Sequence, residues 1–499
     1  MKIKSLTLQA IRVTSLEIGF ATLLAATIPL CALERINLDT SGGEMVGGIA
    51  IGSTVSADGR YVVFESNADL VPEKMSSSYD VYLRDRVLNT TTRISVNVAG
   101  DEANGSSGGS AISANGKFVA FHSAATNLVA GDTNDQEDVF VKDLTTGVVD
   151  RVSVATGGAQ TMIWPSSAPS ISGDGRYVAF YSPADDLVGG DTNGNTDIFL
   201  RDRQNATTTR VNVGPLGVEA NAGESYSPAI SDDGSAVAFR SFATNLVSPA
   251  TSGNASIFVR DLGTNTTTLV SRSTGGAEAD FDCDFPKLSA DGRYVIFMSG
   301  ASNLDPADTD FAPDIFLHDR QLGTTTVVSV ATGGTKGNNA SFNAAISADG
   351  SYIGFMSEST NLVSGDTNAK NDVFVRNLSS GVTERVSVGP NGVQGDDHSG
   401  SSIDFTADGS AFVFESSAGT LVAGDTNMTH DIFYGTSMPP VTPPPVMTPP
   451  DTTVQQAVIQ KQVKTAKKKL KAAKRGGKKS KAKRYKKKIK KLKAQLRQL

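Results

Sequence analysis

Residues Ser172–Ser182 read SGDGRYVAFYS, and the segment Asp197–Asp202, which follows a polar loop, reads DIFLRD. In Tyr177–Ser182 the residues on both faces of an extended chain are apolar, which is typical of a strand buried on both sides. The Asp174-Gly175 pair before it predicts a two-residue hairpin turn from a preceding strand. This stretch therefore predicts neighbouring buried strands of an antiparallel sheet.

The same short turn recurs seven times along the chain. Successive copies are separated by 57, 59, 59, 58, 58 and 59 residues. The seven turns are Asp58-Gly59, Asn115-Gly116, Asp174-Gly175, Asp233-Gly234, Asp291-Gly292, Asp349-Gly350 and Asp408-Gly409. Such a constant period indicates a repeat protein built from equivalent supersecondary units.

Each period contains four β-rich runs separated by Gly, Asn, Asp and Thr residues. In the third unit we expect strand a to end at Ile171-Ser172, strand b to span Tyr177–Ser182, strand c Asp197–Asp202 and strand d Thr208–Val213. Arg210 and Asn212 alternate with Val residues, so strand d is expected to be half exposed. A four-stranded sheet with buried inner strands and a half-exposed outer strand is typical of one blade of a β-propeller.

The two ends of the repeat array predict that the ring closes. The last unit stops at its strand c, Asp431–Tyr434, whereas Glu34–Gly43 (ERINLDTSGG) matches the strand d segment Asp150–Gly158 (DRVSVATGG). The N-terminal segment can therefore supply the missing strand of blade seven and remove the open sheet edges. We predict an all-β protein, a closed seven-bladed propeller of four-stranded antiparallel blades.

The units resemble those of the TolB-like, WD-repeat-like propeller family. The resemblance lies in the pattern S-x-D-G-[RKS]-x-[VI]-x-F-x-S followed by D-[IV]-[FY]-[LV]-x-[DN], as in Ser289–Ser299 with Asp314–Asp319. It implies the fold but no activity, because propellers host both binding and catalysis. TolB itself has six blades and an extra N-terminal domain, so the resemblance does not imply a role in the Tol system for these seven units.

The net charge of −6 is the sum of two very unequal parts. Residues 451–499 contain 20 Lys and Arg and one acidic residue, whereas residues 1–450 contain 26 basic and 51 acidic residues. We expect a signal peptide at 1–32, the propeller at 33–437, a Pro-rich linker at 438–450 and a polybasic helical tail at 451–499. With only 2 Cys and 4 His, a disulfide scaffold and a Cys/His zinc protein are disfavoured.

The N-terminus has the features of a secretory signal. Basic residues precede Ile18–Ala32, an uncharged run of 15 residues that ends in small side chains. A lipid anchor at Cys31 and a retained membrane anchor are the alternatives. We therefore expect a secreted protein, located in the periplasm or at the cell surface.

The connections from strand b to c and from strand d to the next a are long, and we name the face that carries them the long-loop face. Long loops on a rigid scaffold are where binding residues concentrate. Met162, Ile163 and Trp164 lie in such a loop, where other units have polar residues, and Trp164 is the only Trp of the chain. They form a candidate contact site, with packing of Trp164 onto the neighbouring blade as the alternative.

A second candidate site lies in the b–c loops, where Asp and Asn alternate. The repeated sets are Asp132-Asn134-Asp138, Asp191-Asn193-Asn195-Asp197, Asp308-Asp310-Asp314, Asp366-Asn368-Asp372 and Asp425-Asn427-Asp431. Oxygen ligands at alternate positions suit a hard cation such as Ca²⁺. The same residue types also form Asx turns that satisfy loop backbone groups, so the pattern alone predicts no resident cofactor.

The sequence contains no convincing catalytic constellation. Gly105–Gly109 matches G-x-S-x-G, but it lies in a loop of a β-array and not at a strand–turn–helix elbow. His122 and His318 fall in predicted strands b and c, where surface or packing roles are expected. The repeated Asp residues offer many equivalent carboxylates for a glycosidase pair, and the sequence singles out no two of them.

We therefore predict a secreted, monomeric and non-catalytic binding module. Its propeller would recognise a protein or a glycan on the long-loop face. The tail would attach to an anionic envelope polymer or membrane surface, whereas nucleic acid is disfavoured because the acidic body repels phosphate. The alternative is an extracellular propeller enzyme that acts on polysaccharide.

Overall fold

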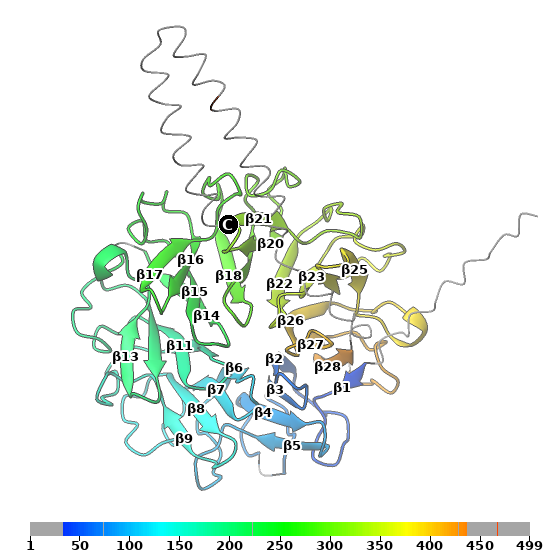
Figure 1. Ribbon diagram of the computed structural model, residues 1–499. Coiled ribbons are helices and arrows are strands. Elements are labelled where there is room, and N and C mark those ends of the chain that lie inside the picture. Colours follow the sequence, from blue (N-terminus) through cyan, green and yellow to red (C-terminus); the bar gives the residue numbers. More distant parts are fainter. Residues whose placement is uncertain (1–32, 73, 222, 428, 437–466, 468–499) are drawn as a thin grey trace, which may run out of the picture. The chain divides into compact units, whose positions relative to one another are not determined.

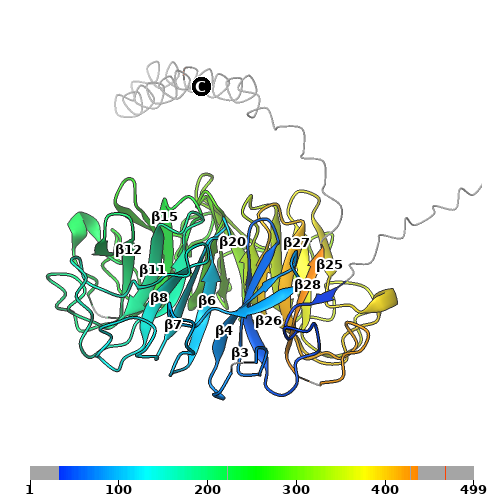
Figure 2. The same ribbon diagram turned by 90° about the horizontal axis from the view of Figure 1, so that it is seen from below.

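The computed structural model describes residues 33–72, 74–221, 223–427, 429–436 and 467. The predicted signal peptide at 1–32 and the linker and tail at 438–499, apart from Lys467, lie outside them. The chain divides into two compact units, Met1–Met438 and Pro439–Leu499. In the first unit, seven four-stranded sheets are arranged in a ring, as the prediction of a seven-bladed propeller requires (Figure 1, and Figure 2 after a 90° turn).

Each blade begins with its innermost strand, a, and continues outward through b, c and d. Blades 1 to 3 consist of β2 (Ala50–Val55), β3 (Tyr61–Ser66), β4 (Asp80–Asp85) and β5 (Thr90–Arg93); β6 (Ser107–Ile112), β7 (Phe118–Ser123), β8 (Asp138–Asp143) and β9 (Val149–Arg151); and β10 (Ser167–Ile171), β11 (Tyr177–Ser182), β12 (Asp197–Asp202) and β13 (Thr207–Arg210). Blades 4 to 6 consist of β14 (Ser225–Ile230), β15 (Ala236–Ser241), β16 (Ser256–Asp261) and β17 (Thr266–Leu269); β18 (Cys283–Leu288), β19 (Tyr294–Ser299), β20 (Asp314–Asp319) and β21 (Thr324–Val327); and β22 (Ser341–Ile346), β23 (Tyr352–Ser357), β24 (Asp372–Asn377) and β25 (Val382–Arg385). Blade 7 consists of β26 (Ser399–Phe405), β27 (Ala411–Ser416), β28 (Asp431–Thr436) and β1 (Glu34–Arg35), and two short 3-10 turns, η1 (Pro215–Gly217) and η2 (Pro390–Gly392), lie in d–a loops.

The blades are held together by apolar contacts between their faces. The buried apolar residues form seven clusters, one at each junction between neighbouring blades. In blade 3 the rings of Phe180 on strand b and Phe199 on strand c stack with centroids 5.9 Å apart, and a ring pair occupies the same place in every blade, up to Phe414 and Phe433 in blade 7. Such pairs contribute about 0.5–1.5 kcal/mol beyond the area they bury.

The a–b connection differs from the predicted two-residue hairpin. In blade 1, Ser56 and Tyr61 form the last backbone pair, with the Ser56 N–H donating to the Tyr61 carbonyl at 2.9 Å, so the loop holds the four residues between them. Only Gly59 takes a positive φ, of 71°, whereas a two-residue type I′ turn needs two such residues. The Asp58 carboxylate instead accepts hydrogen bonds from Ser56 Oγ and the Arg60 N–H, which explains the S-x-D-G pattern as turn chemistry.

Strand d is shorter than predicted from Thr208–Val213. In blade 3 it is β13, which ends at Arg210, and Val213 forms an isolated bridge with Glu219 instead. The strand ends there because the Asn212 side chain turns inward and donates to the buried Asp197 carboxylate at 2.5 Å. The predicted half exposure of strand d is observed at Thr207–Arg210.

Strand β1 closes the ring as predicted from the sequence. It pairs antiparallel with β28, with Glu34 opposite Tyr434, and the two lie side by side in Figure 1. Just after β1, the Asn37 side chain donates to Asp431 Oδ1 at 2.5 Å and accepts from the Ile432 N–H at 2.9 Å. The terminal strand is thus fixed by backbone pairing and by a buried side-chain bridge across nearly the whole chain length.

Replacing Asn37 tests the importance of this closure. Asn37→Ala leaves the buried Asp431 carboxylate and Ile432 N–H without these partners, so we expect a loss of about 2–4 kcal/mol of unfolding free energy. Asn37→Ser is the matched control, because Ser153 makes both equivalent bonds in blade 2, and it should cost less than half as much. Urea unfolding measures both values, and equal losses in the two variants would contradict the bridging role of Asn37.

Candidate functional site

The predicted contact residues Met162, Ile163 and Trp164 lie in the loop between β9 and β10, on the long-loop face. Their side chains are 63%, 66% and 44% exposed. The loop is held below them, where Asp186 accepts the Met162 N–H and Thr161 Oγ donates to the Trp164 carbonyl. Trp164 is therefore nearly half exposed and is not buried against the neighbouring blade.

Two further exposed aromatic residues on this face were missed by the sequence reasoning. Phe281 precedes β18 and Phe311 lies in the following b–c loop, and they are 52% and 64% exposed with ring centroids 6.2 Å apart. Phe281 stands at the repeat position of Trp164, since each lies two residues before a backbone N–H that bonds to the previous blade. The other units have Gly48, Gly105, Gly223, Asn339 and Asp397 at this position. Comparing the units column by column would have revealed Phe281.

The predicted cation-binding residues lie in b–c loops and surround a cationic side chain of the protein itself. In blade 2, Arg151 Nη1 lies 2.9 Å from Asp132 Oδ1 and 3.1 Å from Asp138 Oδ2. Asn134 donates its side-chain amide to Asp138 at 3.2 Å and to the Thr161 carbonyl at 2.8 Å. The oxygen atoms that a Ca²⁺ ion would need therefore already face a guanidinium and an amide group.

The same arrangement recurs in the other units that carry the motif. The groups are Arg210 with Asp191, Asp197 and Glu219; Lys336 with Asp308, Asp310 and Asp314; Arg385 with Asp366 and Asp372; and Arg35 with Glu44, Asp425 and Asp431. Asn193 and Asn427 donate to Asp197 and Asp431 as Asn134 does, whereas Asn195 and Asn368 donate to carbonyls. Three of these groups bring three carboxylates within 4.8 Å of one another, close enough to share a metal ion, but each already contains Arg or Lys.

Differences between the units show that the acids and the cation belong together. In blade 5 the strand position of Arg151 is Val327, and the cation comes instead from Lys336, in the following loop, which lies 2.6 Å from Asp314. In blade 4 the acid is replaced by Ser256, and Leu269 stands where the Arg would be. A buried carboxylate needs a counter-charge. Blade 5 has both the carboxylates and a cation, and blade 4 lacks both at these positions.

Exchange of the blade 4 residues into blade 2 tests this pairing. Arg151→Leu leaves two buried carboxylates without their cation, so we expect a loss of about 3–5 kcal/mol of unfolding free energy. The triple variant Asp132→Ala, Asp138→Ser and Arg151→Leu copies blade 4 and should recover most of the loss. Urea unfolding measures both, and the wild-type melting temperature should not move with Ca²⁺ or a chelator. A rise of several degrees with Ca²⁺ would instead support a metal site.

The innermost strands of the seven blades line a central cavity of about 460 Å³. Glu65 on β3 reaches it as a buried acid, and it accepts hydrogen bonds from the Ser110 N–H at 2.8 Å and from Ser110 Oγ at 3.0 Å. Burial raises the pKa of Glu65 to about 7, and the nearby Glu415 carboxylate adds to this against the hydrogen bonds from Ser110. Glu65 is thus a carboxyl group that titrates near neutral pH inside the channel.

A glycine of the neighbouring strand makes room for Glu65. Gly52 on β2 has a φ of 64°, and a Cβ atom there would lie 2.8 Å from the Glu65 carboxylate. Gly109 on β6 has the equivalent place in blade 2, where a Cβ would lie 2.5 Å from the ring of His122. Both glycines lie at irregularities in the pairing of strands a and b, and such bulges are frequent beside functional sites.

The fifth residue of strand b differs in chemistry from blade to blade. The seven residues are Glu65, His122, Tyr181, Arg240, Met298, Met356 and Glu415. The His122 side chain is 25% exposed. Its partial burial lowers the pKa of the imidazole, and the Glu137 carboxylate, 3.9 Å from Nε2, opposes this change. Glu415 Oε1 lies 2.6 Å from His430 Nδ1, which is within hydrogen-bond distance. This position therefore carries a carboxyl group in blades 7 and 1 and an imidazole in blade 2.

The pH dependence of stability tests the state of Glu65. Because its pKa in the folded protein lies above the ordinary value of 4.5, folding takes up a proton between about pH 4.5 and 7, and stability decreases as the pH rises through this window. Glu65→Gln keeps the acceptor for Ser110 and removes this penalty. The variant should be more stable than the wild type by up to about 3 kcal/mol at pH 8 and by little at pH 4. Denaturant unfolding across this range gives the difference, with the exposed Asp69→Asn as the control that should give none.

The comparisons with known proteins find similar chains among solved structures only. No family model and no curated protein matches the chain. Among solved structures, TolB from Acinetobacter baumannii is similar with 13% identity and a TM-score of 0.37, over 68% of this chain and 64% of that one. An oligogalacturonate lyase in complex with manganese is similar with 14% identity and a TM-score of 0.45, over 83% and 94%. The propeller domain of the Trilobed protease from Pyrococcus furiosus has 10% identity and a TM-score of 0.47, over 79% and 96%.

These similarities are weak, with at most 14% identity and TM-scores below 0.5. The propeller fold that the TolB-like resemblance implies is confirmed by the seven four-stranded sheets of the structure itself. The matched proteins include enzymes as well as TolB. Within the described residues, no helix is both long enough and apolar enough to cross a lipid bilayer.

Proposed function

We propose that the protein is a non-catalytic binding module of the cell envelope or of the secreted fraction. Its propeller recognises a protein or glycan on the long-loop face. The observation that carries this proposal is the exposure of Trp164, Phe281 and Phe311 on loops of that one face. The ligand is held there by aromatic contacts at the ends of rigid blades.

The long-loop face carries three exposed aromatic rings on its loops. Large exposed apolar groups that gather on one face mark interaction sites, and Trp and other aromatics dominate the energetics of interfaces. The tight turns of the opposite face carry exposed aliphatic residues such as Val87 and Leu322, but no exposed Trp or Phe among the described residues. This asymmetry between the two faces favours the long-loop face as the binding surface.

The alternative function, an enzyme acting on extracellular polysaccharide, has one observation in its favour. Glu65 lines the cavity with a pKa near 7, and a second carboxylate, Glu415, lies close enough to influence it. A pair of neighbouring carboxyl groups is what a glycosidase needs. Binding remains the preferred function because the two carboxyl groups are largely buried and Glu65 is already hydrogen-bonded to Ser110.

The envelope location and the role of the tail are proposed from the sequence. The N-terminal segment has the composition of a secretory signal, and residues 451–499 carry 20 Lys and Arg. A chain with this charge is attracted to anionic polymers and lipid surfaces, and the attraction weakens as salt increases. The tail would hold the molecule at such a surface while the acidic propeller binds its ligand.

The binding surface is tested by cross-linking from single positions. A photo-reactive amino acid at Ile163 should capture an envelope protein or glycan, whereas the same group at Leu322, in a tight turn of the opposite face, should not. For the captured ligand, Trp164→Ala and Phe281→Ala should each weaken binding by about 10-fold or more. Because Trp164 is the only Trp of the chain, its fluorescence measures the wild-type affinity directly. Equal capture from both positions would contradict the proposed face.

The role of the tail is tested by retention on isolated cell envelopes. The chain without residues 451–499 should wash off at low salt, whereas the full chain should need high salt, because its attachment is electrostatic. A full-length variant with the 20 Lys and Arg of the tail changed to Gln is the matched control and should behave like the truncated form. Equal retention of all three proteins would show that the tail does not attach the molecule.

A further inference from the structure

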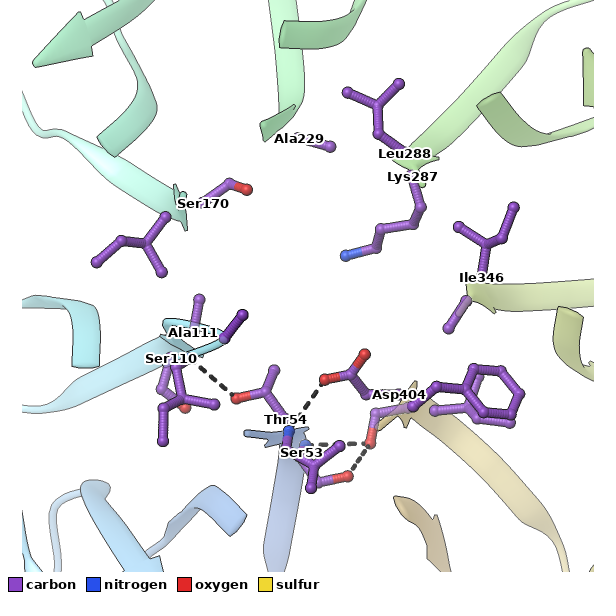
Figure 3. Close-up of a pocket in the computed structure, with 18 of the residues that line it drawn as sticks. Ser53, Thr54, Ser110, Ala111, Ser170, Ala229, Lys287, Leu288, Ile346 and Asp404 are labelled. Atoms are coloured by element: carbon purple, nitrogen blue, oxygen red, sulfur yellow. Dashed lines mark hydrogen bonds between the residues drawn. The ribbon is translucent and has the colours of Figure 1, made fainter. Parts of the chain in front are cut away.

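One register position of strand a faces the channel in all seven blades and is small and uncharged in five of them. The seven residues are Thr54, Ala111, Ser170, Ala229, Lys287, Ala345 and Asp404. We name this set the channel ring. Figure 3 labels all of its members except Ala345 around the cavity, and the Lys287 amine and the Asp404 carboxylate point inward. The ring therefore carries a single positive and a single negative charge.

The two charged groups line the same cavity (Figure 3), and the ion pairs found among the described residues do not include one between them. The backbone of Lys287 pairs with strand β19, but its amine has no hydrogen-bond or ion-pair partner among the described residues. Among the residues that line the cavity, Lys287 is the only Lys or Arg. Asp404 Oδ2 accepts the Val55 N–H of blade 1 at 3.0 Å. Burial raises the pKa of Asp404 to about 6, with the backbone N–H groups and Lys287 opposing, so the group is mostly ionised at neutral pH.

The fold does not require either charge. The role of Asp404 as an acceptor between blades is filled elsewhere by hydroxyl groups: Ser170 Oγ accepts the Ile230 N–H at 3.0 Å, and Thr54 Oγ1 accepts the Ile112 N–H at 3.3 Å. At the position of Lys287 three other blades have Ala. A carboxylate at 404 and an ammonium group at 287 therefore exceed what the repeat needs at this position.

We propose that the channel ring binds a small zwitterion, namely a free amino acid or a short peptide. Its carboxylate is held by Lys287 and its ammonium group by Asp404, with Ala345 of blade 6 between them. The volume of about 460 Å³ is within the range of small-molecule sites, which combine small or apolar walls with a few convergent polar groups. Opposite charges held apart in one cavity are complementary to a ligand that carries both.

The other acidic groups of the cavity make the binding of a simple cation the alternative that has to be tested. Glu65 and Asp232 also line the cavity, so an amine without a carboxylate could be attracted as well. For an amine ligand Lys287 is repulsive, and its removal should strengthen binding. For a zwitterion Lys287 is a ligand group, and its removal should weaken binding. The sign of this one change separates the two ligand classes.

The test is calorimetric titration of the full chain at neutral pH with the standard amino acids and a set of di- and tripeptides. The matching carboxylic acids and amines, each lacking one charge, serve as comparison ligands. We expect at least one zwitterion to bind with one site per chain and more tightly than its singly charged analogues. Lys287→Ala and Asp404→Ser should each weaken that binding by about 10-fold or more.

The variants are matched to residues of the other blades, which keeps the fold intact. Ala replaces Lys287 as in blades 2, 4 and 6, and Ser replaces Asp404 as in blade 3, where it keeps the bond to the next blade. Asp69→Asn, which removes an exposed charge outside the cavity, is the control and should bind as the wild type. Melting temperatures confirm folding. Absence of binding by every zwitterion at millimolar concentration, unchanged binding in both variants, or tighter binding in Lys287→Ala would overturn the proposal.

Discussion

The antiparallel pairing of β1 with β28 is the constraint on which the rest of the structure depends. Each blade buries both of its faces against its neighbours, so the last blade is complete only when it meets the first. Without β1, blade 7 would lack its outer strand, and the Asp431 carboxylate would lose the Asn37 amide that approaches it to 2.5 Å. Closure also fixes the cavity, because the seven inner strands that line it are then held in one closed ring.

The repeat separates residues that build the blade from residues that are free to do something else. The Ser-x-Asp-Gly turns, the stacked rings of strands b and c and the buried Asp–Arg groups have their partners inside the blades. Trp164, Phe281, Glu65, Lys287 and Asp404 occupy columns in which most other units have small or different side chains. Where one unit departs from the others at an equivalent position, the fold does not require that side chain. Trp164, Phe281, Lys287 and Asp404 are therefore the residues that we assign to ligand binding.

The acidic composition of the propeller has a structural basis in the b–c loops. The carboxylates that suggest a calcium motif in the sequence lie against Arg151, Arg210, Lys336 and Arg385. Taking a carboxylate out of water is unfavourable unless a counter-charge or hydrogen bonds replace the water. Each blade meets that requirement with a cation of its own, and blade 4 avoids it by having neither charge.

The sequence by itself determined the number of blades, the order of strands and the closing strand, because these follow from a period and from hydrophobic alternation, which are local properties. It also located Trp164 as an exceptional loop residue. It placed the a–b turn and the end of strand d less well, since the Asp58 and Asn212 side chains reshape the backbone through bonds that a pattern does not reveal. Only the tertiary structure decided that Arg151 lies between Asp132 and Asp138, that Glu65 is buried in the channel, and that Lys287 and Asp404 face one cavity. Arg151 reaches its two carboxylates because strands c and d of one blade pair. Lys287 and Asp404 lie two blades apart along the chain, and they face one cavity because the blades form a ring.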